Sequence, residues 1–431
     1  MPRTSHRRRV VVTGYGMVTP LGRNTGETFS RACRGESGID FIRSFDTTGL
    51  PCRIGGEVED RWLAGAEGVK LSRFEKFAAR SMKLMTIATA EAVQQARLEG
   101  VAARESIGVS LGSHGENPSV EEIRFILNMY EGDGRWDLQQ LAQTGGYPYW
   151  GFFRRKADVA MAILAAVFDC RGVNCSIVSA CAAGAQAIGE AYRYIREGKA
   201  RVMIAGGCEA TLNYAGFVGF VLIKALAERY ASPQQASRPF DRKRSGFVMS
   251  EGAAALVLEE LEHAGARGAP ILGEVLGYGD SADAYRITDT HPHGEGAILA
   301  MKAALEDAAL TPGDVDYINA HGTSTTQNDA VETLAIKKVF SERARSIPVS
   351  SNKSMLGHTI AAAGAIETIL TLVGMQRSLI LPTINQQFPD PKCDLDYVPN
   401  VARHVEHGIA LSNSFGFGGQ NACLCLGKFE A

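Results

Sequence analysis

Residues 174–198, NCSIVSACAAGAQAIGEAYRYIREG, join a short apolar run to a helix of small residues, and this junction decides how the rest of the chain is interpreted. The run up to Ala180 has the composition of a buried strand, and the residues from Cys181 onward have helical spacing of apolar positions. Cys181 therefore stands where a strand gives way to a helix. A thiol in this place is either a small core residue or a nucleophile whose pKa is lowered by the unpaired N–H groups and the dipole of the helix.

The same alternation of strand and helix extends in both directions from this junction. Short apolar runs separated by helical segments are typical of parallel strands covered by helices, so we predict an α/β fold. The predicted strands are residues 8–14, 107–113, 174–180, 201–207, 253–260, 271–279, 315–320, 347–351, 408–415 and 421–429. The predicted helices are residues 70–97, 181–198 and 296–310, one from about Asn328, and a long apolar one after Gly357.

A second junction, VSSNKSMLGHTIAAAGAIE at residues 349–367, resembles the first. In both, a strand that ends in Ser or Ala is followed by a helix of small residues. Such self-similarity indicates an internal duplication, which would also explain the length of 431 residues. The sequence predicts two halves, residues 1–268 and 269–431.

Composition excludes several classes of protein. Hydrophobic residues make up 45% and charged residues 21% of the chain, enough apolar material for a large core. The net charge of −2 gives no general attraction to nucleic acid or to an anionic membrane. The basic start is too poor in apolar residues for a signal peptide, and the longest apolar stretch, residues 358–375, carries Glu367 at its centre. We therefore expect neither a nucleic-acid partner nor a membrane span.

The nine cysteines are scattered, with no CxxC pair and no zinc-like spacing with histidine. This pattern predicts a reduced, cytoplasmic protein without a structural metal.

Two histidines in the second half follow predicted strands. His321 lies in NAHGTSTTQNDAVE, and His358 lies in SNKSMLGHTIAAAGA, five residues after Lys353. The carboxyl ends of strands are where open α/β sheets keep their sites. A lone histidine there is commonly structural, but two of them together with Cys181 favour a catalytic site.

The Gly-rich segment SNSFGFGGQNA, residues 412–422, allows two interpretations. Its glycines could let the backbone present N–H groups to an oxyanion, with Phe417 between them. It could equally be the turn of a hairpin between the last two strands.

These segments, with RRVVVTGYGMVTPLG at the start and SRPFDRKRSGFVMSEGAAALVLEE between them, resemble the β-ketoacyl-acyl carrier protein synthases of the elongating Cys-His-His class, in the thiolase superfamily. The resemblance covers nearly the whole chain. It implies a duplicated, five-layer αβαβα fold, a homodimer, and no metal or cofactor. It also implies a decarboxylative Claisen condensation of a Cys-bound acyl chain with malonyl-acyl carrier protein in fatty acid elongation.

The resemblance assigns roles to individual residues. Cys181 would carry the acyl chain as a thioester, and His321 and His358 would bind the malonyl carbonyl and support the enolate. The backbone N–H groups of Cys181 and Phe417 would form the oxyanion hole, with the Phe417 ring as a gate. The charged groups that would support and orient the two histidines are Lys353, which belongs to the catalytic group, and Asp329, Glu332 and Glu367.

One departure from the family concerns the acyl pocket. Where many members have small apolar residues, this chain reads LGSHGENPSVEEI at residues 111–123, which puts His114 and Gly115 beside the expected pocket closed by Phe417. A polar side chain in an alkyl tunnel must be hydrogen-bonded or turn away. We expect either a polar or unsaturated acyl group beside Gly115, or a pocket left unchanged because His114 and Glu116 point into a dimer contact. The aromatic segment at residues 147–168 is a second departure.

By family position, Arg73, Lys76 and Arg229 would dock the acyl carrier protein, although a solvated charged face gives the same pattern.

Several alternatives stay open or are disfavoured. A dedicated polyketide or polyene ketosynthase would need the same residues, and a heterodimer with a partner subunit is possible, although a non-catalytic subunit would lack Cys181.

A degradative thiolase would use a second cysteine, but Cys423 and Cys425 alternate as strand residues. A dinucleotide enzyme is disfavoured because TGYGMVTPLG lacks a third glycine and Pro20 interrupts the expected helix.

Overall fold

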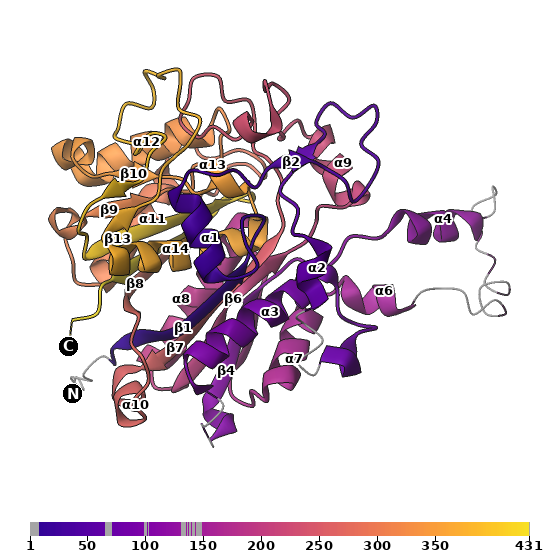
Figure 1. Cartoon of the computed structure of the whole chain (residues 1–431), viewed down its shortest axis with the longest axis horizontal. Helices are drawn as coiled ribbons and strands as arrows, with labels where there is room; N and C mark the ends of the chain where they lie inside the picture. Colours follow the sequence, from indigo (N-terminus) through magenta and orange to yellow (C-terminus); the bar gives the residue numbers. More distant parts are fainter. Residues whose placement is uncertain are drawn as a thin grey trace.

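The computed structural model describes residues 8–64, 71–98, 101, 103–130, 135, 137, 139, 143 and 149–430. Within this part, ten strands form one mixed sheet in the order β10-β9-β13-β14-β8-β1-β7-β6-β4-β5 (Figure 1). Its strands are β1 (Val10–Val18), β4 (Ile107–Gly112), β5 (Asn174–Ile177), β6 (Val202–Glu209), β7 (Gly252–Glu260), β8 (Gly273–Ala282), β9 (Tyr317–Asn319), β10 (Val349–Ser350), β13 (Ile409–Gly416) and β14 (Gln420–Gly427). The small strands β2 (Asp40–Phe41) and β3 (Ile54–Gly55), and β11 (Leu379–Ile380) and β12 (Arg403–His404), pair outside it.

The strand order repeats on either side of the β8–β1 junction. From this junction outward, the strands run β1, β7, β6, β4, β5 in one half and β8, β14, β13, β9, β10 in the other. If the sheet strands of each half are numbered along the chain, both halves have the spatial order 1-5-4-2-3 from the junction outward. This is the order expected of a duplicated unit. We propose that the halves meet near residue 268, between β7 and β8.

Helices cover both faces of this sheet and fill the space between its halves. The longer ones are α1 (Thr25–Cys33), α3 (Arg80–Gln95), α4 (Val120–Asn128), α7 (Ala157–Phe168), α8 (Ala183–Arg196), α9 (Tyr214–Leu222), α11 (Glu295–Asp307), α12 (Asn328–Phe340) and α14 (Ala363–Arg377). The short ones are α2 (Asp60–Leu63), α6 (Tyr149–Arg154), α10 (Leu261–Ala266) and α13 (Lys353–Leu356), and the 3₁₀ turns that matter below are η2 (Leu71–Phe74), η5 (Ala180–Ala182) and η9 (Ile360–Ala362).

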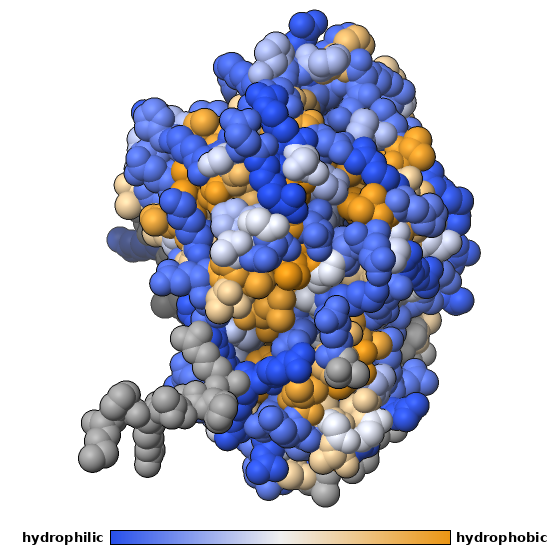
Figure 2. Space-filling view, turned by 90° about the vertical axis from the view of Figure 1, so that its left-hand side faces the viewer, coloured by the Kyte–Doolittle hydropathy of each residue, from blue (hydrophilic) through white to orange (hydrophobic). Residues whose placement is uncertain are grey.

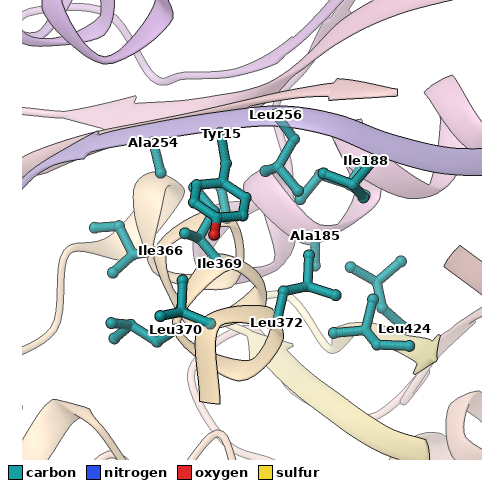
Figure 3. Close-up of a cluster of buried hydrophobic side chains, with 14 of the residues drawn as sticks. Tyr15, Ala185, Ile188, Ala254, Leu256, Ile366, Ile369, Leu370, Leu372 and Leu424 are labelled. Carbon is teal, nitrogen blue, oxygen red and sulfur yellow. The ribbon is translucent and has the colours of Figure 1, made fainter. Parts of the chain in front are cut away.

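The alternation of side chains along the central strands creates five layers. On β7, Leu256 faces the central helices α8 and α14, whereas its neighbour Val257 packs with the outer helices α3 and α7. On β14, Leu424 faces the same central helices, whereas Cys423 and Cys425 pack with α11 and α12. Figure 3 shows α14 between a strand carrying Leu256 and the strand carrying Leu424. The fold is therefore the expected thiolase-like α/β fold, and both cysteines of β14 are core residues.

The structure corrects two predicted elements. The single helix predicted for residues 70–97 is instead η2, a turn and then α3, which begins at Arg80; residue 70 lies outside the described part. Phe77 in this turn packs edge-to-face against Trp150 and Phe153, a tertiary contact that periodicity cannot predict. The strand predicted as buried at residues 174–180 ends at Ile177 and is only partly buried, because β5 is an edge strand with β4 as its one partner in the described part.

Of the helices in the described ranges, none combines the length and the apolar character needed to cross a membrane.

Candidate active site

Three of the four predicted catalytic side chains meet at one cavity of about 610 Å³, which Lys353 does not line. Cys181, His321 and His358 all line it, although they come from two halves of the chain. The sulfur of Cys181 and a ring nitrogen of each histidine lie within 4.8 Å of one another. All three residues are buried, so a substrate bound against them would be shielded from bulk water.

Cys181 lies in the tight turn η5 that precedes α8. Ala180, just before it, has the left-handed φ of 47°, and the turn directs the thiol toward the Gly-rich hairpin. The backbone N–H groups of Phe417 and of Cys181 itself donate toward the sulfur. These are the two groups that the resemblance assigns to the oxyanion hole.

The expected lowering of the Cys181 pKa is wrong for this pocket. Burial raises the pKa of the thiol to about 11, and the positive charge of Lys353 and the N–H of Phe417 oppose that rise only in part. The loss of water around the thiolate outweighs the start of the helix. The resting side chain is therefore a neutral thiol, which must lose its proton during acyl transfer.

The two histidines are neutral. Burial, and next the charge of Lys353, lower the pKa of His321 and of His358 well below 6.5. Their rings lie 5.4 Å apart at an angle of 81°. The backbone N–H of Ile360 donates to Nδ1 of His358 at 3.3 Å, so the ring hydrogen is on Nε2, which finds no hydrogen-bond partner among the described residues. His358 thus has an N–H to offer to a substrate oxygen.

Two of the predicted supporting carboxylates lie against the catalytic loops. Glu332 accepts hydrogen bonds from the backbone N–H groups of His321 and Gly322, both at 2.8 Å, and so holds the loop that carries His321. Glu367 forms a buried ion pair with Lys353. This pair explains a charge in the middle of the apolar helix α14.

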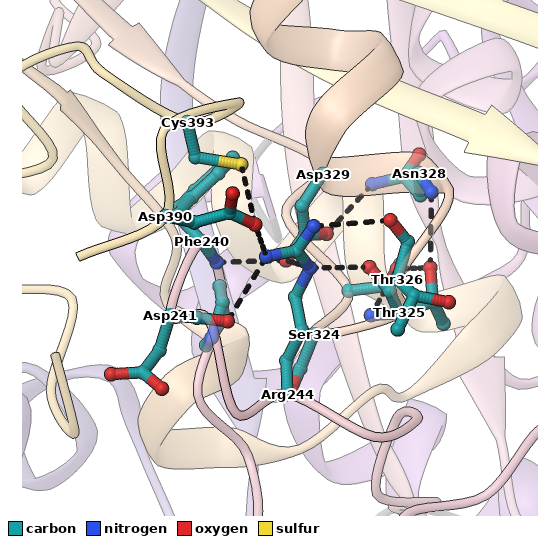
Figure 4. A network of polar contacts seen from close by, with 12 residues as sticks. Phe240, Asp241, Arg244, Ser324, Thr325, Thr326, Asn328, Asp329, Asp390 and Cys393 are labelled. Carbon is teal, nitrogen blue, oxygen red and sulfur yellow. Dashed lines mark hydrogen bonds and ion pairs between the residues drawn. The ribbon is translucent and has the colours of Figure 1, made fainter. Parts of the chain in front are cut away.

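Asp329 supports the catalytic histidines indirectly, through Arg244. Its carboxylate accepts the N–H of Phe240 at 2.8 Å and lies 3.6 Å from the guanidinium of Arg244 (Figure 4). Arg244 in turn donates to the carbonyl oxygens of Thr325 and Thr326. Asp329 therefore holds the arginine that fixes the loop after His321, a supporting contact one residue removed from the imidazoles.

The acyl-pocket predictions have mixed outcomes. His114 and Phe417 line the cavity, as expected. Gly115 is not among the lining residues, and a β-carbon there would clash with the backbone carbonyl of Arg155. Its φ of 79° also favours glycine. The space expected beside Gly115 is therefore absent, and Glu116 lines a second cavity of about 440 Å³ instead.

The three predicted docking cations are all exposed. Arg73 lies in η2, Lys76 lies in the turn before α3 with its ammonium 5.3 Å from the centre of the Trp150 ring, and Arg229 follows α9. Their positions leave them accessible to a partner. Lys224, which is exposed and lines the main cavity, is a further cation that sequence reasoning missed.

Sequence reasoning also missed Glu209 and Thr211 in the cavity wall. Glu209 is the last residue of β6, and its carboxylate lies 2.7 Å from Nδ1 of His114. A carboxylate at the carboxyl end of a buried strand was the signal that could have found it.

The Cys-His-His group is also the kind of donor set that binds zinc. A metal ion held there would occupy the nucleophile, so these residues fit an inhibitory ion better than a resident cofactor.

Comparison with known proteins defines the class. Residues 7–264 match the N-terminal domain model and residues 272–387 the C-terminal domain model of beta-ketoacyl synthases. The chain is 41% identical to a 3-oxoacyl-[acyl-carrier-protein] synthase 2 of Synechocystis, over 98% of this chain and 99% of the relative. It is 40% identical to the protein of the same name from Staphylococcus aureus, over 99% and 100%.

Solved structures agree with this class. A beta-ketoacyl synthase from Burkholderia phymatum superposes with a TM-score of 0.86 at 33% identity, over 98% of this chain and 100% of that one. A type II polyketide ketosynthase, bound to a hexaketide and in complex with its acyl carrier protein, superposes with a TM-score of 0.85 at 33% identity, over 99% and 100%. The chain belongs to the β-ketoacyl synthase family and is an enzyme, a ketosynthase. The family resemblance drawn from the motifs is thereby confirmed.

Proposed function

We propose that this ketosynthase condenses an acyl chain, held as a thioester on Cys181, with malonyl-acyl carrier protein in fatty acid elongation. The products are β-ketoacyl-acyl carrier protein and carbon dioxide. The observation that carries the proposal is the meeting of a buried thiol with two neutral imidazoles, all within 4.8 Å, in a chain of this family. The names of its relatives, 3-oxoacyl-[acyl-carrier-protein] synthase 2, support the same reaction.

The first step loads the enzyme. The sulfur of Cys181 attacks the thioester carbonyl of the incoming acyl carrier, and the neutral imidazole of His321 accepts the thiol proton, because Nδ1 of His358 already accepts the N–H of Ile360 and Nε2 of that ring carries its hydrogen. The N–H groups of Cys181 and Phe417 stabilise the oxyanion that forms. The carrier thiolate then leaves with the proton, and the acyl chain stays on Cys181, while the Phe417 ring acts as a gate.

The second step forms the carbon–carbon bond. The N–H groups of His321 and His358 donate to the carbonyl oxygen of the malonyl thioester. The bond to its carboxylate breaks, carbon dioxide leaves, and the electron pair forms an enolate that the two donors stabilise. The enolate carbon attacks the acyl thioester, and Cys181 leaves as a thiolate that takes up a proton. Because the pKa values of His321 and His358 lie well below 6.5, both imidazoles are neutral when they donate these hydrogen bonds.

The partner in assembly is a second copy of the chain. β5 has one free edge among the described strands, and Val178, directly after it, is exposed. Leu127, Tyr149 and Phe152, on α4 and α6, are further exposed apolar side chains. The side of the molecule opposite α4 and α6, shown in Figure 2, is largely hydrophilic around an apolar patch. We propose a homodimer formed through the β5 edge.

The partner in catalysis is an acyl carrier protein. Exposed Arg73, Lys76 and Arg229 supply positive charge for an acidic carrier, and a structural relative was solved in complex with its own carrier. The nine cysteines are all free thiols, which supports function in the reducing cytoplasm.

A dedicated polyketide pathway is the second candidate. The observation in its favour is the polar side of the acyl cavity around His114, together with the hexaketide-bound relative. Loading Cys181 from carriers with different acyl chains, followed by mass spectrometry of the modified peptide, tests both candidates. A modification mapped to Cys423 instead would overturn the proposed nucleophile.

A further inference from the structure

The acyl cavity contains a charged pair that the condensation does not use. β4 and β6 are parallel neighbours in which Gly112 pairs with Gly207. His114 and Glu209 each follow two residues later, so both side chains emerge at the same edge of the sheet. The carboxylate of Glu209 lies 2.7 Å from Nδ1 of His114, and both residues line the cavity.

The geometry of this pair leaves one polar atom for a ligand. Glu209 is almost fully buried, and its second oxygen accepts the backbone N–H of Ala210 at 3.2 Å. Because Nδ1 of His114 is bound to the carboxylate, Nε2 is the ring nitrogen left to face the cavity, and the side chain is 25% exposed. Burial lowers the pKa of His114, but the hydrogen bond and charge of Glu209 outweigh it and raise that pKa above 6.5. When protonated, the ring carries a hydrogen on Nε2 and is a donor.

A second polar group lies in the same wall. Thr211 lines the cavity, and its buried hydroxyl finds no hydrogen-bond partner among the described residues. The amide of Asn117 also lines it, close to the backbone of Gly216. A hydrocarbon chain placed against these groups would exclude water from them without replacing its hydrogen bonds. An acyl oxygen would restore the bonds.

The wall lies near the reacting end of the acyl chain. The charge of Glu209 contributes to the raised pKa of the Cys181 thiol, so the carboxylate is within electrostatic range of the sulfur. We propose that His114, held by Glu209, and Thr211 form a polar wall that selects acyl chains carrying a carbonyl or hydroxyl oxygen over plain hydrocarbon chains. This inference rests on the proposed function, because it takes Cys181 to be the acyl acceptor, and of the two candidate pathways it favours the polyketide one, whose acyl chains carry oxygen.

Competitive loading of Cys181 tests it without requiring condensation. The wild type is offered equal amounts of acyl carriers bearing a six-carbon saturated chain, the same chain with a hydroxyl or carbonyl at the third or fifth carbon, and a doubly unsaturated chain without oxygen. Intact mass spectrometry measures which chain is on Cys181. We expect at least one oxygenated chain to be preferred over the saturated chain by about tenfold.

Two variants show whether His114 causes the preference. His114→Leu removes the donor and should bring the ratio to within about twofold of one, whereas His114→Gln keeps an N–H donor and should keep part of the preference. The unfolding midpoint and the rate of loading with the saturated chain control for misfolding. Equal loading of all chains by the wild type, a preference for the diene alone, or a preference that survives in His114→Leu would overturn the polar wall and leave the proposed function intact. A complete lack of modification at Cys181 would overturn both.

Discussion

The two strand-to-helix junctions of the molecule share the turn that starts the helix but have different tasks, and in the second one α13 lies between the strand and that turn. In the first, Ala180 has a φ of 47°, the turn η5 follows, and α8 begins at Ala183. In the second, Ile360 has a φ of 44°, the turn η9 follows, and α14 begins at Ala363. The left-handed residue, the 3₁₀ turn and the helix start recur in the same order. The residue after the left-handed position is Cys181 in one and an alanine, Ala361, in the other.

Packing explains why the backbone is kept in both copies. A β-carbon on Gly184 would clash with the carbonyl oxygen of Ala361, and one on Gly364 would clash with Ala185. The two junctions therefore lie against each other in the central layer. A left-handed non-glycine residue costs about 1–3 kcal/mol, and this mutual packing holds both in place. The turn is therefore a structural feature of both halves, and only the first half carries a reactive thiol, Cys181, in it.

The largest expected effect tests the difference between the two copies. Cys181→Ser should lower condensation by about a thousandfold or more, because a hydroxyl is a far weaker nucleophile than a thiol. Ala361→Ser, which puts the same serine at the matching position, should keep most of the turnover. Steady-state rates with malonyl-acyl carrier protein measure both. Comparable losses in the two variants would show that any substitution in this turn disturbs the site.

The histidines supply the next effect. Replacing His321 or His358 by Ala should slow malonyl decarboxylation by about a hundredfold or more, the scale of a lost oxyanion donor. Loading of Cys181 should fall less in His358→Ala than in His321→Ala, because the imidazole of His321 then remains to accept the thiol proton. Carbon dioxide release and acyl loading, measured on the same preparation, separate the two steps. Unchanged decarboxylation in both variants would contradict the assignment.

The glycines at the contact between the junctions test the packing. Gly184→Ala and Gly364→Ala should each lower the free energy of unfolding by about 1–3 kcal/mol, because a methyl group has no room against the facing helix. Gly265→Ala is the matched control, since nothing lies within 4 Å of its would-be β-carbon. Denaturant unfolding measures all three. Equal stability of the control and the contact variants would contradict the close packing.

The smallest effect concerns the state of the thiol. With a pKa of about 11 for Cys181, the thiolate fraction is small at neutral pH and rises about tenfold per pH unit below that value. The rate of alkylation of Cys181 by a small haloacetamide should therefore rise steadily between about pH 7 and pH 9. Mapping the modified peptide excludes the other thiols. A plateau below about pH 8 would instead support the lowered pKa predicted from the helix start.

The sequence by itself determined the α/β class, the repeated junction and the three catalytic side chains. Period-two and helical spacings are local properties, and Cys181, His321 and His358 each carry their own strand-end signature. Only the tertiary structure decided which side chains contact one another and how strongly each is desolvated. Burial in the tertiary structure raises the pKa of Cys181. Contacts between distant segments bring Asp329 to Arg244 and His114 to Glu209. The backbone of Arg155 leaves no room for a pocket beside Gly115. Desolvation and contacts between strands depend on residues far apart in the chain, such as His114 and Glu209, which are 95 positions apart, and no local pattern encodes them.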